Sequence, residues 1–328
     1  MMRAAELLAR RQMQWQELDG LCEELQSSRI SKAAPATISR FASLYRAACA
    51  DLALADAYQL PPDTVLYLHR LVGRAHNQLY RSQRFDYGAW GRMLIHEAPK
   101  RIFQDRCVQL AFMLFWSVFL ASSLLANAKH VWPEYVEQML GEATIHRLES
   151  DFGNPILGRD SETNFYTAAM YIRHNTGIGL KCFAGGLLFI PGLFITTFNA
   201  ASLGAAFGYM ARADVAAGET FFEFVRAHGP FELTAIVLSA GAGLRLGLAW
   251  LSTGGMTRSA SLRKSAREAM PVMGAAMVLF FLAALIEGFL SPSAAPLWIK
   301  TGMAVLSTMI LTFYFVVLGM PVEQRDAT

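Results

Sequence analysis

The chain has 328 residues, of which 54% are hydrophobic and only 17% charged, and its formal net charge is +3. This composition is unusual for a soluble fold, and the small, scattered positive charge gives no reason to expect nucleic-acid binding. Residues 1–106 are charge-rich, whereas residues 107–320 contain long apolar runs, some near the roughly 20 residues that a bilayer core requires. The sequence therefore predicts an all-α protein with a soluble N-terminal part and an integral membrane domain.

The N-terminal part predicts a cytosolic three-helix bundle over residues 1–85. Apolar residues recur at helical spacing in residues 3–27, 35–58 and 63–80, and Pro- or Ser-rich stretches separate these segments. Short connections between such helices are typical of an antiparallel bundle. Residues 86–106 then mix aromatic and basic residues, which predicts an interfacial helix that lies on the inner leaflet and links the bundle to the membrane.

Four apolar segments read clearly as membrane spans, over residues 107–125, 231–251, 271–290 and about 298–319. Between the first two lies an apolar stretch, residues 175–210, that is too long for one crossing and short for two. Gly and Pro residues interrupt it, and broken spans are tolerated where neighbouring helices satisfy the freed backbone groups. The topology depends on how often this stretch crosses.

The basic residues decide that number. Cytosolic loops carry an excess of Lys and Arg, and residues 92–106 and 258–267 are both basic. Both are cytosolic if the stretch forms a tight hairpin that turns near Pro191-Gly192. The sequence thus predicts six spans within 107–320, with five as the alternative, an extracytoplasmic loop at 128–174, and both termini in the cytosol, including a tail at 321–328.

Ionisable residues inside the spans are the candidate functional residues, because such groups are costly in a bilayer and normally face the bundle interior and pair there. With six spans, Lys181, Glu232 and Glu287 lie at similar depth in the outer half, with His228 beside them. We expect Lys181 to pair with Glu232 or Glu287. These four residues form the predicted polar cluster.

The predicted polar cluster has three interpretations. It stabilises a fold with broken helices, it lines a polar path or lipid groove as in transporters with discontinuous helices, or it binds a catalytic metal. His228 and Glu232 are spaced i and i+4, as helical metal ligands are, but an HExxH pair and a second His or Cys cluster are missing, and Pro230 lies between the two residues. The sequence therefore predicts no metal ligand set, no cofactor and no catalytic residue.

Two further polar residues lie in the predicted spans. We expect Asn199, in the middle of the hairpin, to form a hydrogen bond across helices. Arg245, near the inner third of its span, is too far around the helix to pair with Glu232. It is expected to extend toward the inner surface or to bind lipid phosphate.

Small residues predict close helix packing in the same region. Gly204 and Gly208, like Gly243 and Gly247, are small-xxx-small pairs that let two helices approach closely. They serve either a dimer interface or packing within one chain. The short hairpin favours packing within the chain.

Several blocks carry a family resemblance: His228-Gly229-xx-Glu232-Leu233, Gly243-Leu244-xx-Gly247 and Ile286-Glu287-Gly288-Phe289, with Asn175 and Asn199 as supporting matches. In these residues the chain resembles the stage II sporulation protein M family of bacterial integral membrane proteins, and its N-terminal bundle resembles that of the longer, non-sporulation members. The resemblance implies a multipass inner-membrane protein. Founding members act in engulfment during sporulation, alongside peptidoglycan hydrolases, and longer relatives are often encoded with a MoxR-type ATPase.

We therefore expect a non-enzymatic component or scaffold of a cell-envelope complex in the bacterial inner membrane. The alternative is a transporter or lipid-translocating protein that uses the predicted polar cluster, and the third hypothesis is an intramembrane metal-dependent hydrolase. Expected partners are membrane lipids, other membrane or envelope proteins, and further copies of the chain. A MoxR-type ATPase system is a further partner implied by the resemblance.

Overall fold

In a computed structural model the chain divides into two compact units, residues 1–86 and 87–328. The structure describes residues 2–27, 34–79 and 87–320. The predicted tail at 321–328 lies outside the described residues. The two units are called the N-terminal unit and the C-terminal unit below.

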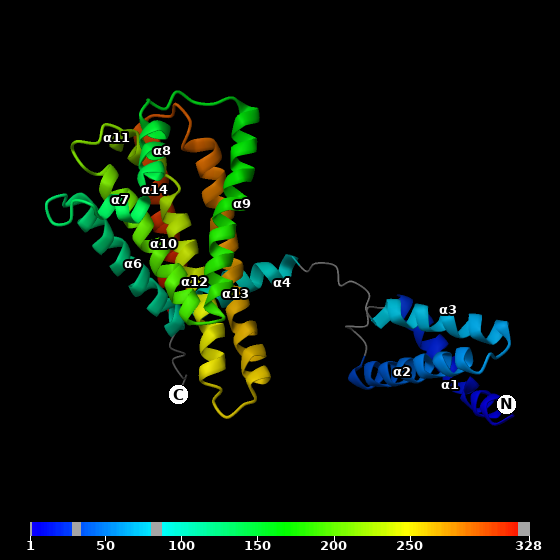
Figure 1. Cartoon of the computed structure of the whole chain (residues 1–328). Coiled ribbons are helices and arrows are strands. Elements are labelled where there is room, and N and C mark those ends of the chain that lie inside the picture. The colour runs from blue at the N-terminus through cyan, green and yellow to red at the C-terminus, as the bar shows by residue number, and fades with distance from the viewer. Residues whose placement is uncertain (1, 28–33, 80–86, 321–328) are drawn as a thin grey trace, which may run out of the picture. The chain divides into compact units, whose positions relative to one another are not determined.

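The N-terminal unit consists of three helices, α1 (Met2–Ser27), α2 (Pro35–Ala57) and α3 (Pro62–Leu79), as the apolar spacing predicts (Figure 1). Proline stands at the start of α2 and of α3, where its missing N–H costs no helical hydrogen bond. The three helices share one apolar core that includes Trp15, Leu18, Phe41, Leu44, Leu68 and Leu71.

One buried carboxylate ties the first two helices of this unit together. Asp51 is fully buried on α2. It accepts a hydrogen bond of 2.9 Å from the Trp15 indole nitrogen and pairs with the Arg11 guanidinium, both on α1. At the surface, the Arg40 guanidinium donates to both carboxylate oxygens of Glu17, at 2.7 and 2.6 Å. The N-terminal unit thus has a core and polar contacts of its own.

The predicted interfacial segment is three short helices, α4 (Tyr87–Arg92), η2 (Met93–Glu97) and α5 (Ala98–Gln104). Ala98 and Ile102 of α5 are buried in the core of the C-terminal unit. Tyr314 donates a hydrogen bond to the Leu94 carbonyl. The three stretches follow one another without a break, so residues 87–104 form one helix with a π-helical turn inside it, and this helix is anchored to the other helices of the C-terminal unit.

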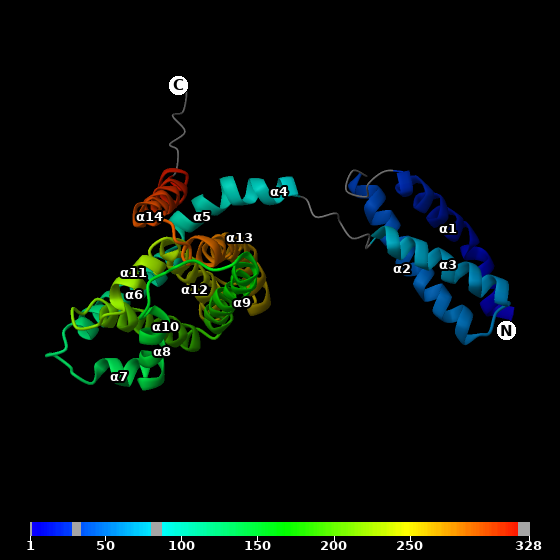
Figure 2. The same cartoon turned by 90° about the horizontal axis from the view of Figure 1, so that it is seen from above.

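The C-terminal unit is built on long helices arranged around α12 (Figures 1 and 2). In the most apolar 18-residue stretch of α12, 72% of the residues are buried. In the last long helix, α14 with η4, the share is only 11%, so this helix lies at the periphery. The long helices are α6 (Arg106–Asn127), α9 (Ser161–Gly186), α10 (Ile190–Met210), α12 (Gly229–Leu251), α13 (Arg258–Leu285) with its extension η3 (Ile286–Leu290), and α14 (Leu297–Thr312) with its extension η4 (Phe313–Val317).

Five of these helices are long and apolar enough to cross a membrane: α6, α10, α12, α13 with η3, and α14 with η4. The sixth, α9, is not apolar enough over its length. It nevertheless runs beside α12 and turns back into α10, so the hairpin of the six-span prediction is present (Figure 1). The turn lies at 187–189, a few residues before the predicted position, and Pro191 stands in the first turn of α10.

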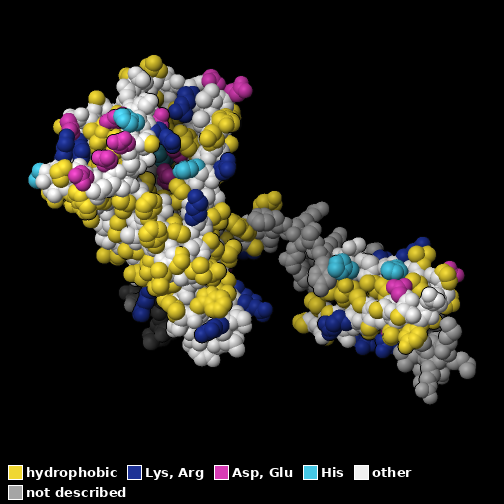
Figure 3. All heavy atoms as spheres, in the orientation of Figure 1, with side chains coloured by type: hydrophobic (Ala, Val, Ile, Leu, Met, Phe, Trp, Pro, Cys, Tyr) yellow, Lys and Arg dark blue, Asp and Glu magenta, His cyan; other side chains and the backbone are white. Residues whose placement is uncertain are grey.

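The two ends of the helix bundle differ. One end, the hairpin end, carries the α9–α10 turn, the α12–α13 connection and the start of α6. The other, the loop-rich end, carries the short helices α7 (Tyr135–Leu140), α8 (Glu142–Phe152) and α11 (Gly218–Val225). Figure 3 shows acidic, basic and His side chains gathered at the loop-rich end, basic ones at the hairpin end, and a hydrophobic belt between them.

The predicted extracytoplasmic loop is shorter than 128–174, because α9 begins already at Ser161. The Asp160 side chain caps this helix by accepting a hydrogen bond of 2.9 Å from the Thr163 backbone nitrogen. The polar first half of α9 is therefore helical and packs against the bundle. Residues 128–160 remain as the connection, and it contains α7 and α8.

Both glycine pairs pack within the chain. A Cβ atom on Gly204 or Gly208 of α10 would overlap the backbone of α6, at the Phe119 and Ser123 carbonyls. A Cβ on Gly243 of α12 would lie only 2.5 Å from the Phe183 carbonyl oxygen of α9, and Gly247 meets α9 one turn later. The favoured interpretation, close approach between helices of one chain, accounts for all four residues.

Candidate functional site

A cavity of about 950 Å³, called the polar chamber below for the ionisable residues in it, opens at the loop-rich end of the C-terminal unit, among α8, α9, α10, α11 and α12. Exposed charged residues, such as Arg147 and Arg159, lie at its open edge. Asn175, His228, Glu232 and Glu287 line its inner part. Three of the four members of the predicted polar cluster therefore face one cavity.

The start of α12 places His228 and Glu232. Gly229 begins the helix and Pro230 occupies its first turn, where the proline does not break the helix because no intrahelical N–H is needed. His228 stands directly before the helix, and its carbonyl accepts a hydrogen bond of 3.2 Å from the Glu232 nitrogen. The His228 Nε2 atom lies 3.7 Å from Glu232 Oε2, beyond hydrogen-bond range.

A π-helical turn places Glu287. Residues Ile286–Leu290 form η3 at the end of α13, and such turns are frequent at functional sites. Gly288 packs so closely on α9 that an added Cβ would lie 2.5 Å from the Ala168 Cβ atom. Asn175 follows Ala168 by two helical turns and donates a hydrogen bond of 3.0 Å to Glu287 Oε2. The close glycine contact thus brings η3 and α9 together at the chamber.

Behind His228 lies a second set of polar residues, in which Ser291 and Lys300 are fully buried and Glu223 is partly exposed. The Ser291 hydroxyl lies 2.9 Å from His228 Nδ1. The Lys300 ammonium group, at the start of α14, donates to the Ser291 carbonyl at 3.1 Å and to Glu223 Oε1 at 2.7 Å. Lys300 is 0% exposed, so its charge is compensated entirely by protein groups.

Lys181 does not belong to this site, which corrects the pairing expected from the sequence. The residue is exposed on α9, and no ion pair joins it to Glu232 or Glu287. Because α9 begins at Ser161, Lys181 falls near the hairpin end of the helix, six residues beyond Asn175. At 1.5 Å per residue this is about 9 Å farther along the axis. The lysine that is buried at the loop-rich end is Lys300, which is not a member of the predicted polar cluster.

Arg245 and Asn199 both have partners within the protein. At the hairpin end, the Arg245 Nε atom donates to Asp105 Oδ2 at 2.7 Å, and the guanidinium also pairs with Glu268. Arg245 therefore takes part in an ion-pair network within the protein, which the sequence did not predict. Asn199 donates within its own helix, to the Ile195 carbonyl at 2.8 Å, and also across to α9, as expected, through a 3.9 Å hydrogen bond to the Cys182 sulfur.

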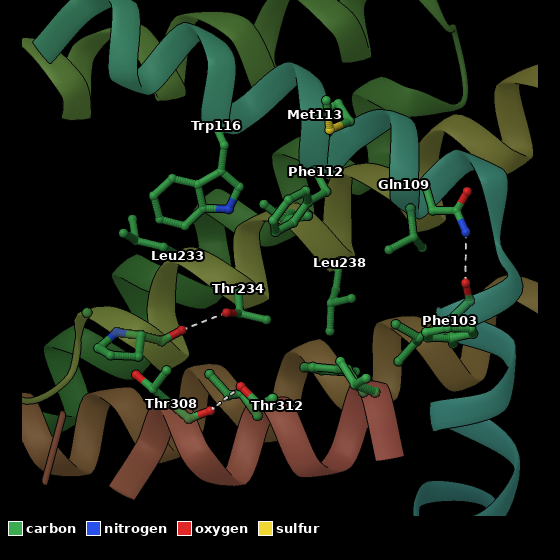
Figure 4. Close-up of a pocket in the computed structure, with 18 of the residues that line it drawn as sticks. Phe103, Gln109, Phe112, Met113, Trp116, Leu233, Thr234, Leu238, Thr308 and Thr312 are labelled. Atoms are coloured by element: carbon green, nitrogen blue, oxygen red, sulfur yellow. Dashed lines mark hydrogen bonds between the residues drawn. The ribbon is translucent and has the colours of Figure 1, made fainter. Parts of the chain in front are cut away.

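The chamber borders a second cavity. An apolar groove of about 960 Å³ lies between α6, α12 and α14, the peripheral helix (Figure 4). The hydroxyl groups of Thr234, Thr308 and Thr312 in this groove donate to backbone carbonyls of their own helices, which leaves the surface largely apolar. Four residues line both cavities and form a thin wall between them: Phe207, Val225, Gly229 and Leu233.

Comparisons with known proteins identify two matched segments. The family model described as stage II sporulation protein M matches residues 110–292, which is more than half of the chain and includes all the residues that line the chamber. A model described as a domain of unknown function, DUF8413, matches residues 5–81, within the N-terminal unit. No curated protein and no solved structure gives a match.

Proposed function

Because the chain belongs to the stage II sporulation protein M family of membrane proteins, we propose that it is a non-enzymatic component of a cell-envelope complex in the bacterial cytoplasmic membrane. In this proposal the C-terminal unit is the membrane anchor. The N-terminal unit is the docking module that binds partner proteins. A MoxR-type ATPase system is one such partner that the family resemblance suggests.

The observation that carries the docking role is the independence of the N-terminal unit. It has its own core, an ion pair on a buried carboxylate, and a family model of its own. Large apolar side chains remain exposed on both sides of the α2–α3 turn: Leu54 and Tyr58 on one side and Leu66 on the other. Exposed apolar side chains of this size are candidates for contact with a partner protein.

The docking role is tested by co-purification of the full chain from its native membrane, followed by mass spectrometry. We expect the partners to be lost when Tyr58 and Leu66 are both replaced by Glu, because charge removes the apolar contact. Glu232→Gln, which changes the chamber and not the N-terminal unit, is the matched control and should keep them. The proposal fails if the surface variant retains every partner.

The proposed orientation follows from charge. Arg258, Arg263, Lys264 and Arg267 are all exposed near the hairpin end, and loops rich in Lys and Arg stay on the cytosolic side. The hairpin end then faces the cytoplasm, the chamber opens outward, and the N-terminal unit is cytoplasmic. A cysteine introduced at Ser259 should react with a membrane-impermeant maleimide only after the cells are opened. Labelling in intact cells would reverse this orientation.

A non-enzymatic role is also supported by the burial of Ser291, the hydroxyl side chain in contact with His228. Ser291 is 0% exposed, and its hydroxyl is used in the contact with the imidazole. A nucleophile must reach its substrate, so the buried Ser291 hydroxyl beside His228 does not act as one.

The wall between the two cavities favours a second candidate function, the handling of a lipid. A lipid could place its acyl chain in the apolar groove and its head group in the polar chamber. Only the wall formed by four residues separates the two sites: Phe207, Val225, Gly229 and Leu233. Scrambling of a fluorescent lipid by the chain in liposomes tests this role. Glu232→Gln and Glu287→Gln should reduce the rate, while Lys181→Gln, outside the chamber, should not. If liposomes that contain the wild-type chain show no scrambling, the lipid-handling role is excluded.

A further inference from the structure

We propose that His228, Glu232 and Glu287 bind one divalent transition-metal ion of the zinc class inside the polar chamber. One ligand-type atom from each of the three side chains lies within 4.8 Å of the other two. A metal with ligands at about 2.1 Å in tetrahedral geometry needs about 3.4 Å between ligand atoms. Small rotations of the two Glu side chains close that difference. This site is independent of the docking role of the N-terminal unit.

The imidazole of His228 is prepared as a ligand. The residue is 3% exposed, and the Ser291 hydroxyl contacts its Nδ1 atom at 2.9 Å. When this hydroxyl accepts the Nδ1 proton, the Nε2 lone pair points toward Glu232. Metal-binding histidines have this arrangement, in which a second partner fixes the ring and its tautomer.

The ring is also held in place by its surroundings. The Phe224 ring packs edge-on against it, with the ring centroids 5.6 Å apart. Lys300 in turn fixes the backbone of Ser291 through its 3.1 Å hydrogen bond to the Ser291 carbonyl. Three elements, α11, η3 with Ser291, and α14, therefore orient one imidazole, which is more support than a histidine needs for packing alone.

The two carboxylates are positioned in the same way. Asn175 donates to Oε2 of Glu287 at 3.0 Å, which leaves the other oxygen of that carboxylate for a metal. Glu232 approaches the same point from α12, one turn after His228. Two carboxylates facing each other in a mostly buried place repel, and a divalent cation bound between them removes this repulsion.

The ligand set selects the class of metal. Imidazole nitrogen suits zinc and other transition metals, whereas Mg²⁺ and Ca²⁺ prefer oxygen ligands alone. Three protein ligands leave a fourth position, and the chamber, which holds Glu232 and Glu287 in its lining, provides the space for it. The site would therefore take water or a ligand from the outer side.

The test uses the full chain, purified in detergent, stripped of metal with a chelator and titrated with ZnCl₂ by calorimetry, with elemental analysis of bound metal. We expect about one Zn²⁺ per wild-type chain, unaffected by excess Mg²⁺. His228→Gln and Glu287→Gln should each weaken binding by more than about tenfold, and Ser291→Ala by about 10- to 100-fold. His174→Gln, in the same chamber but outside the ligand set, should bind like the wild type.

Failure of the wild-type chain to hold stoichiometric Zn²⁺ would overturn the site, and so would equal binding by Glu287→Gln. Equal losses in His174→Gln would do the same, because they would indicate surface binding. If the ligand variants fail to fold, the visible absorption spectrum of the wild-type chain loaded with Co²⁺ tests the site instead. A four-coordinate nitrogen–oxygen site gives intense visible absorption, and a spectrum equal to that of hydrated Co²⁺ refutes the proposal.

Discussion

Replacement of Gly243 by Ala should destabilise the C-terminal unit, because this glycine sets the distance between α12 and α9. The new Cβ atom would lie 2.5 Å from the Phe183 carbonyl oxygen and 2.9 Å from that of Cys182, both in the α9 backbone. Ordinary contact begins at 3.4 Å, so the two helices must separate locally by about 0.9 Å. A backbone cannot rotate away as a side chain can, and overpacking of this kind costs about 1–3 kcal/mol.

The matched control is Gly177→Ala. Gly177 lies in α9, the helix that Gly243 contacts, but nothing lies within 4 Å of the Cβ that alanine would add there. Because alanine is the better helix former, this variant should gain about 0.5–1 kcal/mol. The two free energies of unfolding are measured by SDS titration of the full chain in detergent micelles, followed by far-ultraviolet circular dichroism. The reasoning is refuted if Gly243→Ala unfolds at the wild-type midpoint, or if Gly177→Ala loses as much stability.

Three other substitutions test contacts of the two units. Asp51→Ala should cost about 1–3 kcal/mol in chemical denaturation of the N-terminal unit, because buried donors of α1 lose their acceptor. Lys300→Met should cost about 3 kcal/mol in SDS titration, and less when combined with Glu223→Gln, because the single change leaves a carboxylate unpaired. Burial raises the pKa of the Cys22 thiol, so a maleimide at neutral pH should label Cys49 and spare Cys22 until the unit unfolds.

Each of these predictions has a control. Asp56→Ala, at an exposed position, should leave the stability of the N-terminal unit within about 0.5 kcal/mol of the wild type. Equal costs for the single Lys300 variant and the Lys300–Glu223 double variant would show that the two side chains are not coupled. Labelling of Cys22 at the rate of Cys49 in the folded chain would contradict the buried position of that thiol.

The helices of the N-terminal unit could be predicted because their signals are local. Pro35 and Pro62 mark the starts of α2 and α3, and the apolar residues between them repeat with the helical period. The partners of Asp51 could not be predicted in the same way. They lie 36 and 40 positions away in the sequence, and no spacing rule connects them.

The site was predicted in part, and the error has a clear cause. Glu232, Glu287 and His228 were selected correctly as neighbours because ionisable residues in apolar runs are costly. Lys181 was placed with them because the predicted span began at residue 175, whereas Asp160 caps a helix that begins at Ser161. Hydropathy does not detect a helical segment as polar as residues 161–174, most of whose polar side chains are exposed.

Lys300 was overlooked for a related reason. A single lysine in the first turn of an apolar helix usually indicates a residue at the membrane surface. Its burial depends on Glu223 and on the carbonyl of Ser291, which come from other elements. The Gly288 contact with Ala168 was equally hidden, although the short sequence Glu287-Gly288 offered a signal, since a glycine beside a buried carboxylate permits close approach of another helix.

The composition of α9 has a consequence for how the protein is made. Its first half is too polar to partition into a bilayer by itself, and its second half joins α10 through a turn of three residues. If α9 crosses the membrane, we expect the two helices to be inserted together, because α10 is apolar enough to span and α9 is not. Asn175 finds its partner only after η3, more than a hundred residues later, has been synthesised. Until then Asn175 lacks its hydrogen-bond partner. The chamber is therefore among the last parts of the protein to assemble.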